Sequence, residues 1–320
     1  MKAIRVEAFG EPDVLQLQDT ADLSPGPDQI LVELKAIGVN PVDTYIRSGQ
    51  YAQRPSLPYT PGMDGAGIIK STGKDIKHYA GGDRVYVTGS LTGTYAQQTL
   101  CLKEHIFSLP DNITFQQGAA LGIPYTTAYR ALFTKARALA GETVLIHGAS
   151  GGVGLAALQL AKAANLRVIA SAGSEKGQVL LKEQGADLIV NHTQPDYMDQ
   201  IVRFTEGRGV NIILEMLANV NLKADTEILA REGRIIVIGC RATAQINPRE
   251  LMVRDASIIG MLILNMSGEE RAKVFSALEE GLQNGRLNPV IGEELPLAQA
   301  KKAHKKVLES GAYGKIILIP

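Results

Sequence analysis

The chain has 320 residues, 45% hydrophobic and 21% charged, which excludes wholesale disorder and leaves room for two domains. Lysine and arginine together number 33, as do aspartate and glutamate, so no net charge attracts nucleic acid or an anionic membrane. No stretch approaches the roughly 18 uninterrupted apolar residues of a membrane helix, and charges within residues 1–7 interrupt any signal-peptide core. The two cysteines, Cys101 and Cys240, are too few for a disulfide framework. We therefore expect a cytoplasmic protein.

The first third of the chain is typical of short strands separated by turns. Residues 30–34 and 83–87 are strand-like, and glycine- and proline-rich breakers stand at 25–27 and 81–82. This pattern predicts a compact β-rich domain that extends to about residue 110, with a barrel as one option.

From residue 143 onward, strands alternate with helices. Strands are predicted at 144–146, 168–170, 188–190, 212–214 and 235–238, and an apolar stripe at helical spacing predicts a helix over 153–164. Alternation of this kind indicates a parallel, doubly wound α/β sheet that is covered on both faces.

The last part of the chain adds two helices and a strand. Ser267 and Glu270 form a capping-box pattern that predicts the start of a helix, and a second helix is expected near residues 297–310. The strand predicted at 315–319 is free to return to the β-rich domain, which would make that domain discontinuous.

A glycine-rich turn links the strand at 144–146 to the helix that follows. Its spacing is G-x-x-G-x-x-G, formed by Gly148, Gly151 and Gly154. A dinucleotide pyrophosphate binds to backbone N–H groups at a helix N-terminus, and glycine is needed where backbone approaches phosphate. A plain glycine turn is the alternative, but the strand-to-helix context favours a dinucleotide site.

The choice between NAD and NADP depends on the end of the second parallel strand. An NAD site usually offers a carboxylate there, whereas this chain has small residues followed by Glu175 and Lys176. Lys176 would supply a positive charge to a 2′-phosphate, provided that Glu175 points outward. A solvated lysine is the alternative. The sequence favours NADPH.

Several longer runs resemble one family. Residues 38–49, 57–62, 122–129, 144–154 and 215–221 are similar to the zeta-crystallin-like NADPH:quinone oxidoreductases, which are zinc-free members of the medium-chain dehydrogenase/reductase superfamily. The resemblance covers essentially the whole chain. It implies a GroES-like substrate domain formed by residues 1–122 and 266–320 and a Rossmann NADP-binding domain formed by residues 123–265. In this family the active site lies in the cleft of the two-domain fold.

The zinc ligands of related dehydrogenases have no counterparts here. Asn40 stands where those relatives have a cysteine, Met63 stands where they have a histidine, and their four-cysteine loop is missing. No metal site is expected, because zinc requires thiolate and imidazole ligands in a closed set. The five histidines, which we interpret as surface or hydrogen-bonded residues, are His78, His105, His147, His192 and His304. Without a Lewis acid, the acceptor must already be electron-poor, as quinones and enones are.

The resemblance also implies the site residues. Catalytic roles are assigned to Asn40, Asp43, Tyr45 and Tyr51, in the loop that faces the nicotinamide in the family. The tyrosines would stack on a planar acceptor or donate to its oxygen, with simple packing as the alternative. No general acid is assigned. The positions expected to bind the cofactor are Asn40, Tyr45, Thr126, Ser150, Gly151, Gly152, Val153, Gly154, Gly173, Lys176, His192, Asn221, Ile238, Gly239, Cys240, Arg241, Met261, Leu262 and Ile263.

Two other functions remain as alternatives. An NADPH-dependent enone or alkenal double-bond reductase would keep the cofactor and change the acceptor. Binding of AU-rich RNA is associated with zeta-crystallin relatives, but the basic cluster at 301–306 is better interpreted as the solvated face of a helix. The apolar run at 256–264 predicts a sheet edge that pairs with a second copy, giving a homodimer, with a tetramer left open.

Overall fold

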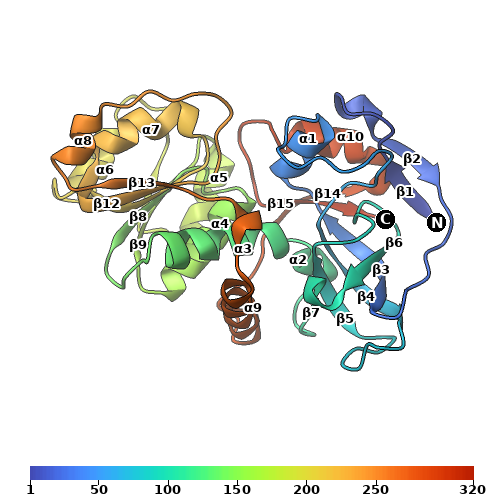
Figure 1. Cartoon of the computed structure of the whole chain (residues 1–320). Helices are drawn as coiled ribbons and strands as arrows, with labels where there is room; N and C mark the ends of the chain where they lie inside the picture. The colour runs from blue at the N-terminus through green and yellow to red at the C-terminus, as the bar shows by residue number, and fades with distance from the viewer. The chain divides into compact units, whose positions relative to one another are not determined.

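The computed structural model describes all 320 residues, which form two compact units (Figure 1). The first unit comprises Met1–Ile123, Asn288–Ser310 and Gly314–Pro320, and the second comprises Pro124–Leu287 and Gly311–Tyr313. The chain thus returns to the first unit at residue 288, whereas the sequence suggested 266. Helix α9 (Gly268–Gln283) belongs to the second unit, where Glu270 in its first turn accepts a hydrogen bond from Nε of the buried Arg130 at 2.8 Å.

The first unit is built on a mostly antiparallel sheet. Its strand order is β14-β15-β3-β4-β5-β7, and β6 pairs with one end of β3. The terminal strand β15 (Lys315–Ile319) pairs with the other end of β3, so the predicted return of the chain is confirmed. The remaining strands and helices of this unit are β1 (Lys2–Arg5), β2 (Gln16–Asp19), β3 (Gln29–Gly38), α1 (Pro41–Arg47), β4 (Asp64–Thr72), β5 (Arg84–Thr88), β6 (Gln98–Leu102), β7 (Ile106–Ser108), α2 (Phe115–Gly118), β14 (Ile291–Pro296) and α10 (Ala300–Lys306).

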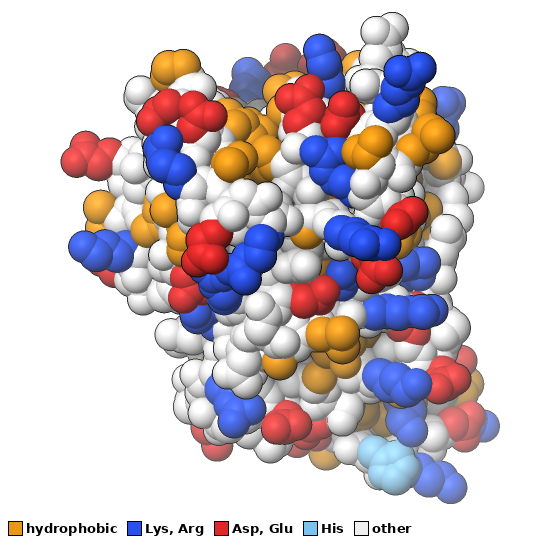
Figure 2. All heavy atoms as spheres, turned by 90° about the vertical axis from the view of Figure 1, so that its left-hand side faces the viewer, with side chains coloured by type: hydrophobic (Ala, Val, Ile, Leu, Met, Phe, Trp, Pro, Cys, Tyr) orange, Lys and Arg blue, Asp and Glu red, His pale blue; other side chains and the backbone are white.

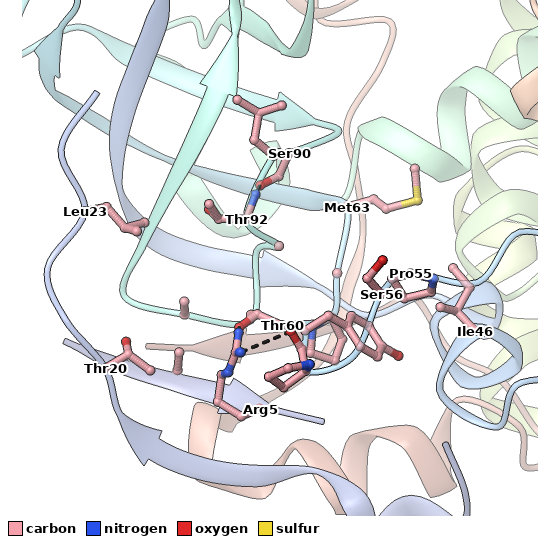
Figure 3. A pocket seen from close by; sticks show the side chains of 18 of the residues that line it. Arg5, Thr20, Leu23, Ile46, Pro55, Ser56, Thr60, Met63, Ser90 and Thr92 are labelled. Carbon is pink, nitrogen blue, oxygen red and sulfur yellow. Dashed lines mark hydrogen bonds between the residues drawn. The ribbon is translucent and has the colours of Figure 1, made fainter. Parts of the chain in front are cut away.

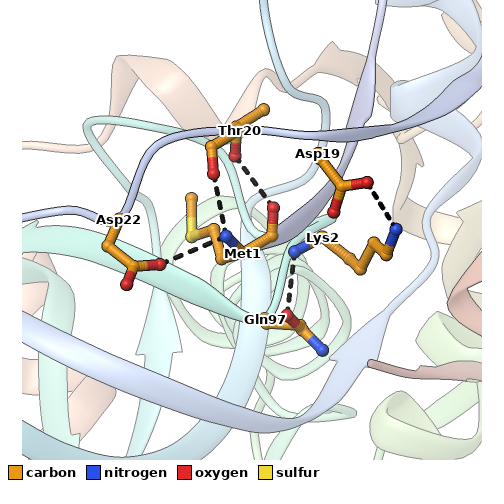
Figure 4. A network of polar contacts seen from close by, with 6 residues as sticks. All are labelled: Met1, Lys2, Asp19, Thr20, Asp22 and Gln97. Carbon is orange, nitrogen blue, oxygen red and sulfur yellow. Dashed lines mark hydrogen bonds and ion pairs between the residues drawn. The ribbon is translucent and has the colours of Figure 1, made fainter.

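Strands β1 and β2 form a separate ribbon whose ends are joined by polar contacts (Figure 4). The amino group of Met1 donates to the carbonyl oxygen of Thr20 at 2.8 Å and to Asp22 Oδ1 at 3.1 Å. Lys2 Nζ donates to Asp19 Oδ2 at 2.6 Å. Because Asp19 and Asp22 are 78% and 74% exposed, these ion pairs contribute little to stability. The ribbon is anchored instead by Ile4, which belongs to the apolar core of the unit.

The second unit contains a six-stranded parallel sheet in the order β10-β9-β8-β11-β12-β13, which confirms the predicted doubly wound arrangement. The chain order reverses between β8 and β11, and the crevice at such a reversal is where open α/β sheets bind ligands. Its elements are α3 (Gly122–Tyr129), a π-helical turn (Arg130–Lys135), β8 (Thr143–Ile146), α4 (Gly152–Ala163), β9 (Arg167–Ser171), α5 (Glu175–Glu183), β10 (Leu188–Val190), α6 (Tyr197–Phe204), β11 (Val210–Glu215), α7 (Ala218–Glu227), β12 (Leu229–Val237), α8 (Pro248–Met252), β13 (Ser257–Gly260) and α9.

Helices cover both faces of the parallel sheet. Leu145 and Ile213 pack in one apolar cluster with Ile201 of α6 and Leu222 of α7. Their neighbours along the strands point to the opposite face and are equally buried. Figure 1 shows α7 and α8 on one side of the sheet and α4 on the other. A strand that is buried on both faces must be apolar throughout, which is why these strands are continuous runs of valine, isoleucine and leucine.

Charged side chains of both signs are mixed on the surface face seen in Figure 2. On the face shown in Figure 2, basic side chains (blue) and acidic ones (red) are interspersed with apolar atoms (orange). On α10, Lys306 pairs with Glu293 at 2.6 Å and Lys301 pairs with Asp13 at 3.5 Å, so acidic partners face these lysines. No helix has the length and hydropathy that a membrane span requires.

Candidate active site

The predicted phosphate loop connects β8 to α4 in the second unit. Gly148 has a φ of +56°, a conformation that favours glycine. Gly151 is the N-cap of α4 and provides no side-chain cap, so the first N–H groups of the helix have no intrahelical partner. A Cβ at Gly154 would lie 2.5 Å from the carbonyl oxygen of Gly148, so only glycine fits there. The loop therefore presents free backbone donors at the positive end of a helix, the arrangement that binds a pyrophosphate.

Ser150, in the same loop, has a different partner. Its Oγ donates to the carbonyl oxygen of Ala312 at 2.6 Å, and its side chain is buried. Ala312 and Tyr313 belong to the short segment of the C-terminal chain that joins the second unit. The sequence did not predict this segment as part of the nucleotide site. Ser150 therefore fixes the loop, and its backbone rather than its hydroxyl remains available to a ligand.

The adenosine half of the predicted site lies beyond β9 and β10. A Cβ at Gly173 would be 3.0 Å from His192 Nε2, so the structure brings these two predicted residues together. Lys176 is exposed in the first turn of α5, and its Nζ lies 3.8 Å from the centre of the Tyr313 ring. Glu175 is also exposed, as the interpretation of Lys176 requires. The cation–π contact orients the ammonium group of Lys176.

The loops that follow β11 and β12 are tied together. The N–H groups of Ile238 and Gly239 both donate to the carbonyl oxygen of Glu215, at 2.9 and 3.2 Å. A Cβ at Gly239 would lie 2.4 Å from the carbonyl oxygen of Met216, which explains the glycine. Asn221 donates from Nδ2 to Glu215 Oε1 at 3.2 Å. Asn221, Ile238 and Gly239 thus form one cluster around Glu215.

Cys240 and Arg241 stand outside that cluster. Both are exposed, and the backbone N–H of Arg241 donates to Asn219 Oδ1 at 2.9 Å. The thiol of Cys240 contacts the carbonyl oxygen of Ala242 at 2.8 Å. These contacts hold the chain that leaves β12 against the start of α7. Cys240 and Arg241 therefore lie beside the cluster around Glu215 and are not part of it.

The remaining predicted cofactor residues lie on α3 and after β13. Thr126 is buried, and its hydroxyl has no hydrogen-bond partner, as expected of a group that binds a ligand. Met261 donates its N–H to the carbonyl oxygen of Val237 at 3.1 Å, and Leu262 is 40% exposed. Arg130 NH1 donates to the carbonyl oxygen of Leu262 at 3.0 Å. Arg130 therefore fixes the segment that contains Met261, Leu262 and Ile263.

In the first unit, the predicted catalytic residues begin on helix α1 and not on a loop. Asn40 precedes the helix, Pro41 opens it, and Asp43 Oδ2 accepts from the N–H of Asn40 at 2.8 Å. A proline at the first helical position and an acidic residue in the first turn both favour a helix start, so this short helix was identifiable. Tyr45 lies on the helix and is half-buried, whereas Tyr51 follows it and is half-buried as well. Burial raises the pKa of Tyr51.

Asn40 is held from two sides by buried charged groups. Its Nδ2 donates to Asp64 Oδ2 at 2.8 Å, and its Oδ1 accepts from Lys315 Nζ. Lys315 Nζ also lies 3.6 Å from Asp64 Oδ2, and both side chains are at most 5% exposed. Burial lowers the pKa of Lys315, while the nearby Asp64 opposes the shift. Sequence reasoning missed Asp64 and Lys315. Lys315 opens a predicted strand, which was a usable signal, whereas no strand was predicted at Asp64.

Asp43 is part of a buried chain of polar side chains. Its Oδ2 accepts from the Tyr95 hydroxyl at 3.2 Å, and the same hydroxyl lies 3.1 Å from His304 Nε2. Its Oδ1 has no partner. Burial raises the pKa of Asp43 to about 7, with Asp64 adding to the shift and the N–H of Asn40 opposing it. Asp43 therefore changes its charge near neutral pH.

A cavity of about 750 Å³ lies within the first unit (Figure 3). Asp43 and Ile46 of α1 line it, as does Met63, which stands in place of a zinc-ligand histidine. Arg5 lies at the lower side of the cavity in this view, and its NH1 donates to Thr60 Oγ1 at 3.3 Å. Its size is in the range of small-molecule sites, roughly 300–1,000 Å³. The cavity is therefore a candidate acceptor site, and Asp43 is the one predicted catalytic residue that lines it.

The sequence also missed a buried cluster in the second unit. His147, Glu215 and Asp225 are each at most 3% exposed, and their polar atoms lie within 4.8 Å of one another. His147 was expected to be a surface or hydrogen-bonded histidine, and it is hydrogen-bonded to Asp225. The available signal was Glu215, a charged residue at the end of an apolar strand. Asp225, in the last turn of α7, gave none.

Comparisons with known proteins agree with this architecture. Residues 26–111 match an alcohol dehydrogenase GroES-like domain, and residues 152–280 match a zinc-binding dehydrogenase domain. A Homo sapiens quinone oxidoreductase is 46% identical to this chain. The alignment covers all of this chain and 98% of the human protein.

Solved structures also match over their full length. The Escherichia coli quinone oxidoreductase complexed with NADPH has a TM-score of 0.88 at 29% identity, with complete coverage of both chains. An NAD-dependent alcohol dehydrogenase has a TM-score of 0.92 at 28% identity, again with complete coverage. The same fold thus occurs with both cofactors, and individual residues must decide between them.

Proposed function

The chain belongs to the quinone oxidoreductase family of the medium-chain dehydrogenase/reductase superfamily, and from this premise we propose that it reduces quinones with a hydride supplied by NADPH. The observation that carries the proposal is the glycine-lined N-terminus of α4, where Gly154 leaves no room for a side chain. The unpartnered hydroxyl of Thr126 adds a second polar group without a protein partner in the same unit. These features fit a bound dinucleotide, and the full-length similarity to quinone oxidoreductases supports the acceptor.

The preference for NADPH depends on Lys176. Its ammonium group is exposed at the N-terminus of α5 and is oriented by the Tyr313 ring. A 2′-phosphate placed there would gain a charge-assisted hydrogen bond. The serine at position 174 is the N-cap of α5 and accepts from the N–H of Gly177 at 3.2 Å, so no acidic residue occupies the cap. NADH would lack the phosphate that Lys176 binds.

We infer that the reaction requires no zinc. The ammonium of Lys315 donates to the Asn40 side chain, at the position that holds a zinc ligand in related dehydrogenases. A zinc ion beside this ammonium would be repelled, because like charges in a buried site interact strongly. A thioether such as that of Met63 is not among the usual zinc ligands. In place of a metal centre, the chain therefore has the buried ion pair between Lys315 and Asp64.

The acceptor must then be electron-poor, and a quinone meets that condition. We place it in the cavity beside Asp43 and Ile46, within reach of residues from α1. Tyr45 and Tyr51 do not line this cavity. Their proposed role, to bind the ring of the acceptor or donate to its oxygen as negative charge develops, requires an acceptor that extends beyond it. Positioning of the acceptor supplies much of the rate in such a reaction. A Tyr45→Phe variant with unchanged turnover would remove the role of the Tyr45 hydroxyl.

A panel of acceptors tests this proposal. NADPH oxidation is followed with 1,2- and 1,4-quinones and with alkenals, while semiquinone is monitored by electron paramagnetic resonance. We expect turnover with quinones and little with alkenals. The reverse order would identify an enone or alkenal reductase. The resonance signal separates one-electron from two-electron reduction.

Two further properties belong to the proposal. The edge strand β13 supports a homodimer, because Leu262 and Leu264 beyond it are 40% and 42% exposed. A cytoplasmic location is supported by Cys101 and Cys240, which are both free thiols. RNA binding gains no support from α10, where lysines face Asp13 and Glu293.

A further inference from the structure

His147, Glu215 and Asp225 form a buried cluster that the proposed reaction does not use. His147 follows β8, Glu215 ends β11, and Asp225 lies in α7. His147 Nε2 lies 2.8 Å from Asp225 Oδ1 and 3.6 Å from Glu215 Oε2. Both carboxyl groups are fully buried, so solvent does not screen them. An arrangement of this kind must keep its charges balanced within itself.

The hydrogen bonds of the cluster are incomplete without an additional proton. Glu215 Oε1 accepts from the N–H of Leu217 and from Asn221 Nδ2. In contrast, Glu215 Oε2 and Asp225 Oδ2 have no hydrogen-bond partner in the structure. Two ionised carboxylates this close together repel, and one of them retains a proton. A proton on Glu215 Oε2 that is donated to Asp225 would satisfy both oxygens at once.

The electrostatic environment favours the same distribution of protons. Burial raises the pKa of Glu215 to about 8, and its contact with Asp225 adds to the shift, while His147 opposes it. Burial by itself lowers the pKa of His147, but Asp225 and Glu215 outweigh burial and raise it. An imidazolium, one carboxylate and one carboxylic acid give the cluster no net charge.

Two other titratable groups face the cluster from neighbouring elements. His192 follows β10, and its pKa is lowered by burial and by the nearby His147. Tyr197 lies on α6, and its pKa is raised by burial and by Asp225 and Glu215. Both groups are therefore neutral around pH 8. The groups of the cluster that change charge are therefore Glu215 and His147, and only the titration of Glu215 is removed by an amide at position 215.

Glu215 also connects the cluster to the predicted cofactor residues. Its side chain holds Leu217 and Asn221, and its carbonyl oxygen accepts from Ile238 and Gly239. His147 directly precedes Gly148, the first glycine of the phosphate loop. The cluster thus lies beneath three of the loops that are expected to bind the dinucleotide.

We propose that Glu215 is a positioning residue: its carboxyl group keeps a proton that it shares with Asp225, and this form holds Asn221 and residues 216–221 in the conformation that binds the cofactor. The inference relies on the proposed function only for the identity of the cofactor. Loss of the proton leaves two facing carboxylates, which push the β11–α7 loop away from Asp225. Binding of NADPH then weakens as the pH rises.

The test compares wild type with Glu215→Gln, because an amide donates and accepts like the protonated acid but does not ionise. NADPH dissociation constants are measured by fluorescence titration between about pH 6.5 and about pH 9, a range that brackets the titration. We expect the wild-type constant to rise by about tenfold over this range and that of Glu215→Gln to stay within about twofold. Glu227→Gln, an exposed change on α7, serves as the matched control and keeps the wild-type profile.

The melting temperature of the protein without cofactor gives a second, independent readout. It should fall with rising pH in wild type and fall less in Glu215→Gln. Equal pH dependence of the two proteins in both measurements would overturn the shared proton. Stabilisation of wild type, but not of the variant, by added Zn²⁺ would overturn it too, because the three side chains would then hold a cation. Failure of wild type to bind NADPH at any pH would refute the proposed function, while the melting profiles still decide the protonation of Glu215.

Discussion

At the scale of single residues, we propose that Lys176 carries the preference for NADPH. Replacing Lys176 by alanine removes one charge-assisted hydrogen bond to the 2′-phosphate, which is worth about 1.5–3 kcal/mol. We therefore expect the dissociation constant for NADPH to rise by about 10- to 100-fold and that for NADH to change little. Isothermal titration calorimetry with both cofactors measures this. Lys182→Ala, an exposed change on the same helix, is the control, and equal losses for both cofactors in Lys176→Ala would remove the assignment.

Asp43 gives a prediction about pH and stability. The pKa of Asp43 in the folded protein is about 7, above its usual value of 3.8, so folding favours the neutral form. Its contribution to stability is therefore present below pH 3.8 and is lost as the pH rises through about 7. In Asp43→Asn, the free energy of unfolding should fall less between these limits, by up to about 1.4 kcal/mol per pH unit.

Urea unfolding at several pH values measures the difference between wild type and Asp43→Asn. Asp28→Asn, an exposed change in the same unit, is the control and should keep the wild-type slope. A slope in Asp43→Asn that equals that of wild type would mean that Asp43 is ionised throughout this range. In that case the hydrogen bonds that Asp43 accepts from Asn40 and Tyr95, which favour the ionised form, would outweigh the effect of burial on its pKa.

At the scale of elements, the strand–loop–helix unit formed by β8 and α4 depends on Gly154. A methyl group there would meet the backbone of residues 148 and 149 at 2.5 Å, and overpacking of this kind costs about 1–3 kcal/mol. Gly154→Ala should lower the melting temperature and weaken NADPH binding. Gly268→Ala is the matched control, because a Cβ at Gly268 meets nothing within 4 Å. Wild-type binding by Gly154→Ala would contradict the close approach of backbone to phosphate.

The parallel sheet was the most predictable part of the molecule. Its strands are short apolar runs, and each one identified from the sequence is present in β8 to β12. The capping role of Ser267 is also confirmed, since its Oγ accepts from the N–H of Glu270 at 3.2 Å. The carboxylate of Glu270, however, binds Arg130. That contact spans 140 residues of sequence, so no local pattern indicated it.

The polar interior was less predictable for the same physical reason. Asn40 and Asp43 were recognised as site residues, but their partners are distant in sequence: Lys315 opens β15, and Tyr95 lies in the loop before β6. Chain topology brings Lys315 to Asn40 when β15 pairs with β3. Local patterns of hydrophobicity identify which residues are buried, whereas they do not identify which buried polar groups meet. The structure places α9 in the second unit, which no local pattern in the sequence indicated.

At the scale of the whole molecule, the exposed apolar residues after β13 predict self-association. We expect light scattering at micromolar concentration to give the mass of a dimer. Leu264→Lys should shift the protein toward the monomer, because it introduces charge next to the edge strand. Leu139→Lys, at a residue that is 67% exposed elsewhere in the same unit, is the control. A monomeric wild type would contradict the proposed interface, and a tetramer would indicate a second one.

We propose that this chain transfers hydride from NADPH to a quinone without zinc. It is tested most directly by NADPH oxidation with a 1,4-quinone, using protein treated with a chelator and shown by mass spectrometry to contain no metal. We expect undiminished quinone-dependent oxidation of NADPH in the metal-free protein, because Lys315 binds Asn40 at the position proposed to replace a zinc ligand. Loss of this activity on removal of metal, with recovery on addition of Zn²⁺, would contradict it.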